Sequence, residues 1–131
     1  MFKKLIIALV VIFIGGVVFM PEITAIMANT AVEPKNQNAS WAPGMAYTAA
    51  KINLRFFRFG TAAKIYERAI ETWPNADWQA DAHFQVAIAY EKDGDGKTAI
   101  ELYNVFLRKY PDHPWKEQAE KRITNIQANM L

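Results

Sequence analysis

The chain has 131 residues, 52% of them hydrophobic and 21% charged, with a formal net charge of +2 and no cysteine. This length accommodates one small domain. Without cysteine there is no disulfide framework, no cysteine-ligated zinc, no thiol nucleophile and no lipidated N-terminal cysteine. A net charge of +2 is too small to indicate nucleic-acid binding.

The N-terminal segment has the pattern of an export signal or a membrane anchor. Lys3 and Lys4 precede an uninterrupted apolar run, Leu5–Met20, which Pro21 ends. As a helix this run reaches ~24 Å, which is short of a ~30 Å hydrocarbon core. No Ala-x-Ala cleavage site follows it, which favours an uncleaved anchor over a signal peptide removed from a soluble periplasmic or secreted protein. Lysines ahead of the run keep the N-terminus cytoplasmic and place the rest on the outer, periplasmic side.

These features divide the chain into three parts. We expect residues 1–28 to be the signal-anchor or signal peptide. Residues 29–43 are rich in Asn, Ala and Pro and lack periodicity, which predicts a flexible linker. Residues 44–131 are then left to form the folded domain.

The folded part repeats at an offset of 37 residues, which keeps small, aromatic, aliphatic and proline positions in register. The matched pairs are Ala62 with Ala99, Tyr66 with Tyr103, Ile70 with Leu107, Pro74 with Pro111, Trp78 with Trp115, Ala82 with Ala119 and Val86 with Ile123. Within each copy, apolar residues recur at steps of three and four, which indicates amphipathic helices. A period in the thirties with two helices per unit is typical of a solenoid.

We therefore predict an all-α fold with about five antiparallel helices after the N-terminal hydrophobic helix. Proline after a periodic stretch ends a helix, and the Asp93-Gly94-Asp95-Gly96 segment ends another. The short links between stretches make neighbouring helices antiparallel. The predicted helices cover residues 44–59, 61–73, 78–92, 97–110 and 115–128.

At these positions the sequence resembles the tetratricopeptide repeat (TPR) family. The second unit has Ala87, Tyr90 and Gly94 at the small, aromatic and turn positions of the family pattern. The first unit has Asn53 at an aromatic position, and its Gly60 comes three places late. The spacing and the run FLRKYPDHP are most like exported bacterial members, of the β-barrel assembly lipoprotein and Tol–Pal periplasmic coordinator types. The resemblance implies a short α-solenoid of about two and a half repeats.

The resemblance also implies a protein or peptide partner, bound on the concave surface formed by the first helix of each repeat. The alternative for the apolar positions is packing against a neighbouring helix or the N-terminal tether. Carried over to this chain, the groove positions are Tyr47, Lys51, Leu54, Arg55, Phe84, Ile88, Glu91, Lys121 and Asn125.

Lys51, Arg55 and Arg58 lie at helical spacing among aliphatic and aromatic residues. A basic, aromatic-rich amphipathic helix can lie on an anionic membrane surface. A solenoid helix with a solvated basic face accounts for the same pattern, and we favour it because the following helix needs a partner. The two interpretations are compatible if the domain lies close to the bilayer.

No combination of residues indicates catalysis. His83 and His113 lack the spacing of metal ligands, and no nucleophile, base and orienting group come together in the pattern. We therefore expect no cofactor or metal, and we predict a non-catalytic protein-interaction module without nucleic acid. The alternative is a permanent small structural subunit of a membrane-associated complex. A short stack leaves apolar end surfaces, which favours self-association or a permanent partner.

Overall fold

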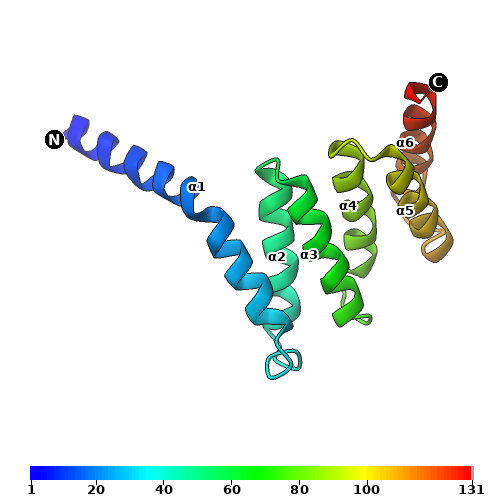
Figure 1. Cartoon of the computed structure of the whole chain (residues 1–131), viewed down its shortest axis with the longest axis horizontal. Coiled ribbons are helices and arrows are strands. Elements are labelled where there is room, and N and C mark those ends of the chain that lie inside the picture. The colour runs from blue at the N-terminus through cyan, green and yellow to red at the C-terminus, as the bar shows by residue number, and fades with distance from the viewer. Residues whose placement is uncertain (131) are drawn as a thin grey trace.

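The computed structural model describes residues 1–130, which form six α-helices and no strand. This confirms the predicted helical solenoid with a preceding apolar helix (Figure 1). The helices are α1 (Phe2–Val32), α2 (Ala42–Arg55), α3 (Phe59–Thr72), α4 (Gln79–Lys92), α5 (Gly96–Lys109) and α6 (Lys116–Asn129).

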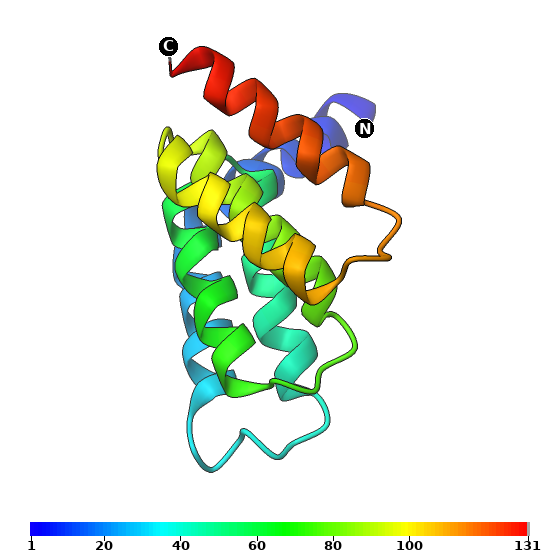
Figure 2. The same cartoon turned by 90° about the vertical axis from the view of Figure 1, so that its right-hand side faces the viewer.

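Each helix packs against the next one along the chain, so the structure is a stack of antiparallel hairpins. The α2–α3 and α4–α5 hairpins are the two repeat units, and α6 covers the open side of α5. Figure 2 views the stack from the α5–α6 side and shows the later helices lying across the earlier ones at an angle. The chain has no single central core, because each hairpin buries its apolar face against its neighbours.

The repeat offset corresponds to equivalent positions in the packing. Ala62 and Ala99 are fully buried, and so are Tyr66 and Tyr103, 37 residues apart in each case. Alanine lets two helix backbones approach closely, and a large aromatic side chain one turn further along fills the adjoining space.

Helix α1 has two halves with different surroundings. Residues 2–19 are almost entirely exposed and extend away from the rest of the chain (Figure 1). From Met20 onward the helix packs against α2, and it buries Met20, Thr24, Ala28 and Ala31 on one face. The second half therefore belongs to the repeat stack.

The residues expected to form a linker are partly helical. Residues 29–32 belong to α1, residues 42 and 43 belong to α2, and residues 33–41 connect the two helices. The Asn36 side chain donates a hydrogen bond to the Thr30 carbonyl at 2.8 Å. The indole of Trp73, the residue that follows α3, donates one to the Gln37 carbonyl at 2.9 Å. The segment between α1 and α2 is therefore shorter than the predicted 29–43, and it contacts the end of α3.

The α2–α3 turn occurs earlier than the glycine in this region suggested. Helix α2 ends at Arg55, not Phe59, and the residue with the left-handed backbone is Phe57, with φ 61°, not Gly60. The Arg58 amide donates to the Asn53 carbonyl at 2.9 Å, just as the Asp95 amide donates to Tyr90 in the next unit. Phe57 thus occupies the position that Gly94 (φ 91°) occupies 37 residues later. Both units close with the same helix-ending motif.

Phe57→Gly is expected to raise the free energy of unfolding by about 0.5–1 kcal/mol, because glycine adopts a positive φ without a steric penalty. The matched change, Gly94→Phe, is expected to lower it by about 1–2 kcal/mol. A Cβ at position 94 would meet no atom within 4 Å, so its cost comes from the backbone alone. The free energy of unfolding of each variant is measured by urea titration, with circular dichroism as the signal. Equal stability of Phe57→Gly and the parent chain would contradict the strain at Phe57.

Candidate partner-binding surface

Four of the residues predicted to form a groove come together beside α2 of the first repeat. Tyr47, Lys51, Leu54 and Arg55 are on α2 and line a pocket of about 250 Å³. The opposite wall consists of Tyr66 from α3 together with Asp81 and Gln85 from α4. The pocket, called the α2–α4 pocket below, therefore lies between two successive repeat units.

Tyr47 organises the aromatic side of the α2–α4 pocket. Its ring stacks on Trp78 with centroids 5.3 Å apart and an interplanar angle of 8°. The Lys51 ammonium lies over the same ring, 5.2 Å from its centroid. The Tyr47 hydroxyl donates a hydrogen bond to the Asp81 carboxylate. Together these contacts fix the position of the tyrosine before any ligand arrives.

Asp81 is the acidic group of the pocket. Partial burial raises the pKa of its carboxyl, while the hydrogen bond with Gln85 and the charge of His113 oppose that shift. The raised pKa reduces the tendency of this carboxyl to ionise. Lys51 and Arg55 are both exposed and form no ion pair with any of residues 1–130. The pocket thus holds two exposed cations and one partly buried carboxyl group.

Tyr66 has a polar group without a partner. Its side chain is fully buried, and its hydroxyl makes no hydrogen bond within the described chain. Burial raises the pKa of this phenol, so the hydroxyl stays protonated as a donor and an acceptor. An unsatisfied buried hydroxyl costs about 1–3 kcal/mol. Tyr66 also lines the α2–α4 pocket, although its hydroxyl is not exposed there.

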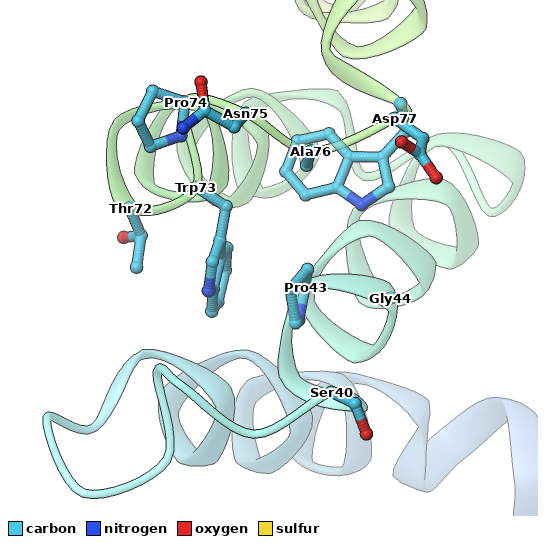
Figure 3. A pocket seen from close by; sticks show the side chains of 10 residues that line it. Ser40, Pro43, Gly44, Thr72, Trp73, Pro74, Asn75, Ala76 and Asp77 are labelled. Atoms are coloured by element: carbon cyan, nitrogen blue, oxygen red, sulfur yellow. The ribbon is translucent and has the colours of Figure 1, made fainter.

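A second pocket, of about 520 Å³, lies at the end of the stack where the α3–α4 turn meets the start of α2. Figure 3 shows the Trp73 ring and Pro43 facing each other across it, with Asp77 near its edge. This end pocket was not predicted from the sequence. Its signal was the pair Trp73 and Trp78 on either side of a proline turn.

Trp78 connects the two pockets. It stacks on Tyr47, which lines the α2–α4 pocket, and it also lines the end pocket beside Trp73. The two tryptophan rings meet edge to face at 6.5 Å. Three aromatic rings therefore follow one another from Tyr47 through Trp78 to Trp73, and the Lys51 ammonium lies over the first of them.

Phe84 and Ile88 do not line the groove that was predicted for them. Phe84 is 2% exposed and Ile88 is 8% exposed. The Phe84 ring packs against Trp115, Phe106 and Tyr103, with centroid distances of 5.0, 5.3 and 5.7 Å. The alternative of packing against neighbouring helices is the one that the structure shows. These two side chains lie in the core shared by α4, α5 and α6.

The three remaining predicted groove residues are outside the α2–α4 pocket. Glu91 forms an ion pair with Arg122 of α6 at 3.0 Å and accepts a hydrogen bond from the Tyr103 hydroxyl. It therefore connects α4 to α6. Lys121 and Asn125 are exposed one turn apart on α6. Neither is among the residues that line the pocket.

The histidines have structural surroundings. Partial burial and the charge of Lys109 lower the pKa of His83, whose ring lies 5.8 Å from that of Tyr110. His113 lies between Phe106 and Trp115. Over residues 1–130, no group of three or more His, Asp or Glu side chains is placed to hold a metal ion. What the site offers is hydrogen bonds, cations and aromatic faces.

A stack of alanine-lined helix hairpins with a polar, aromatic pocket between successive repeats defines a helical-repeat protein of the tetratricopeptide type. Residues 40–121 match the model of the YfiO family, described as outer membrane lipoprotein, and the chain belongs to this family. A comparison with curated proteins found no match. The family assignment supports a non-catalytic role in protein interactions.

Helix α1 lies outside the matched residues. Within the described chain it is the one helix long and apolar enough to cross a membrane. Together with the family, this makes the chain an exported, membrane-associated protein.

Proposed function

We propose that this chain is a membrane-anchored docking module that binds an extended acidic segment of a protein partner. The segment lies in the α2–α4 pocket, and no chemical change occurs there. The observation that carries the proposal is the meeting of Lys51 and Arg55 with the Tyr47 ring in one pocket. Carboxylates of the partner would pair with the two cations, and its apolar atoms would contact the tyrosine ring.

The charge of the pocket favours an acidic ligand. Lys51 and Arg55 are free to pair with carboxylates, since neither forms an ion pair with any of residues 1–130. Charge-assisted hydrogen bonds are roughly twice as strong as neutral ones. Leu54 lines the same pocket and supplies an apolar contact. An acidic segment that also carries an apolar side chain fits this lining.

The aromatic surface from Tyr47 to Trp73 favours an extended ligand over a compact one. Beyond the cations, the same segment can place apolar or proline side chains on Trp78 and Trp73 in the end pocket. Aromatic anchors of this kind contribute disproportionately to binding energy at interfaces. The two pockets then act as one binding surface.

We further propose that α1 holds the module on the outer side of the membrane, as the lysines ahead of its apolar run predict. The family description names a lipoprotein, yet this sequence has no cysteine to carry a lipid. A membrane-spanning α1 supplies the anchor instead.

Lys51→Glu is expected to weaken partner binding at least about tenfold, because it replaces an attractive charge contact with a repulsive one. A photo-reactive amino acid at Gln85 in the full-length chain, in native membranes, would cross-link the bound segment for identification by mass spectrometry. Binding of the identified segment is then measured with purified components.

The matched control is Lys64→Glu on α3, which makes the same charge change at an exposed position outside the pocket. It is expected to leave binding unchanged. Equal losses of affinity in both variants would show a general effect of charge and would contradict binding in the α2–α4 pocket. If both variants still co-purified with a stoichiometric partner, that result would favour a permanent structural subunit over a docking module.

A further inference from the structure

The α2–α3 turn forms an exposed tip that combines aromatic and basic side chains. We define this aromatic tip as Phe56, Phe57, Arg58, Phe59 and Lys92. Phe56 is 43% exposed and Phe57 is 78% exposed. The Phe57 and Phe59 rings meet edge to face at 6.0 Å, and the Lys92 ammonium lies 5.8 Å from the centroid of the Phe59 ring.

The fold gains little from exposing these rings. Phe57 has a left-handed backbone, which is costly for any residue except glycine, and its ring contacts solvent over most of its surface. The equivalent turn in the second repeat uses Gly94 and exposes no aromatic group there. The aromatic tip is thus a feature of the first repeat alone, the repeat next to α1.

The packing of α1 against α2 determines where the aromatic tip lies along α1. Ala31 shares a buried cluster with Ala42 and Ala46, and Ala28 shares one with Ala49 and Ala50. The two helices are antiparallel, so moving back along α1 corresponds to moving forward along α2.

Continuing this register places Met20 of α1 level with Phe56 of α2. Met20 is the last residue of the apolar run Leu5–Met20, where the chain would leave the hydrocarbon. Figure 1 shows the α2–α3 turn at the end of the stack from which the exposed half of α1 extends. The aromatic tip is therefore beside the membrane surface whenever α1 spans the bilayer.

The charge of the tip matches an anionic lipid surface. Arg58 and Lys92 form no ion pair with any of residues 1–130. Asp93 is the acidic neighbour, close to Gly60, while the carboxylate of Asp95 accepts two hydrogen bonds from Thr98. Basic residues are attracted to an anionic leaflet, and phenylalanine is among the residues that interfacial segments bury at the boundary between headgroups and acyl chains.

We propose that the aromatic tip lies in the anionic headgroup layer of the membrane that α1 crosses. Phe56 and Phe57 enter the interface, and Arg58 and Lys92 face lipid phosphates. This second attachment, together with α1, fixes the tilt of the stack relative to the membrane. The α2–α4 pocket then stays accessible from the aqueous side. The proposal depends on α1 spanning the membrane, and it is independent of what the pocket binds.

The absence of cysteine allows a direct test with a single introduced label. The full chain carrying Phe57→Cys is labelled with a nitrobenzoxadiazole group, itself aromatic, and reconstituted into phosphatidylcholine vesicles with or without phosphatidylglycerol. In anionic vesicles we expect blue-shifted emission and quenching by headgroup nitroxide lipids. High salt, or Arg58→Glu in the same chain, is expected to reduce the quenching at least twofold.

The matched control label is Asn75→Cys, which is exposed in the α3–α4 turn at the opposite end of the stack. Its emission is expected to be the same in both vesicle types. Equal quenching at positions 57 and 75 in anionic vesicles would overturn the proposal. A blue shift at 57 that depends on protein density in neutral vesicles would also overturn it, and would assign the tip to a second copy of the chain.

Discussion

Phe84→Ala is expected to lower the free energy of unfolding by about 3–5 kcal/mol, the cost typical of removing a buried phenylalanine ring. Phe84 is 2% exposed and packs against aromatic rings from α5 and from the start of α6. Its removal leaves a cavity between the second repeat and the closing helix. For a small domain this loss is a large fraction of the total stability.

The full-length chain is unfolded with urea in detergent, and unfolding is monitored by circular dichroism at helical wavelengths. We expect the midpoint of Phe84→Ala to shift to a lower urea concentration. Lys121→Ala on exposed α6 serves as the control, with an expected change within about 0.5 kcal/mol. If the midpoint of Phe84→Ala stayed unchanged while partner binding was lost, Phe84 would be a groove residue, as the family pattern implied.

Removing all of α1 is expected to cost roughly 4 kcal/mol or more, whereas removing only its exposed half is expected to cost almost nothing. The second half of α1 buries Met20, Thr24, Ala28 and Ala31 against the stack. Burying a methionine side chain contributes ~1.5–3 kcal/mol, and each buried methyl group adds ~0.8 kcal/mol. The exposed residues 2–19 make almost no such contacts.

Two chains make the comparison, one of residues 19–131 and one of residues 34–131. We expect the first to be a folded, soluble monomer and the second to unfold at lower urea concentration or to associate through the uncovered alanine face of α2. Light scattering and urea titration measure both. Equal stability of the two chains would show that α1 is only an anchor and not part of the stack.

The packing of α1 against α2 is also relevant to whether the N-terminal segment is cleaved. A mature chain that began between Thr24 and Val32 would lose part of the α1 face that covers α2. An uncleaved anchor keeps that face intact. On this ground we propose that the N-terminal segment is retained as an anchor.

The helices and their repeat were predictable because they depend on local spacing. Steps of three and four define an amphipathic helix, and Pro74 and Pro111 mark the turns after α3 and α5. The offset of 37 residues located the buried pair Tyr66 and Tyr103 correctly. The α2–α3 turn was misplaced because Gly60 was the obvious candidate, whereas the hydrogen bonds that end α2 require the positive φ at Phe57.

Only some of the predicted groove residues line one pocket, because exposed and buried positions have the same spacing along a helix. Tyr47, Lys51, Leu54 and Arg55 come together as expected. Phe84 and Ile88 have the same helical spacing, yet α5 and α6 cover them. Whether an apolar residue is covered depends on the tilt between successive hairpins, which no residue pattern within one helix records.

The all-helical repeat, the apolar N-terminal run and the basic character of α2 can be read from residue types at fixed spacing. Three other features emerge only from the packing of the helices: half of α1 packs in the stack, Trp78 connects two pockets, and the Tyr66 hydroxyl is buried without a partner. These features depend on contacts between helices, and burial is a property of the neighbours rather than of the residue itself.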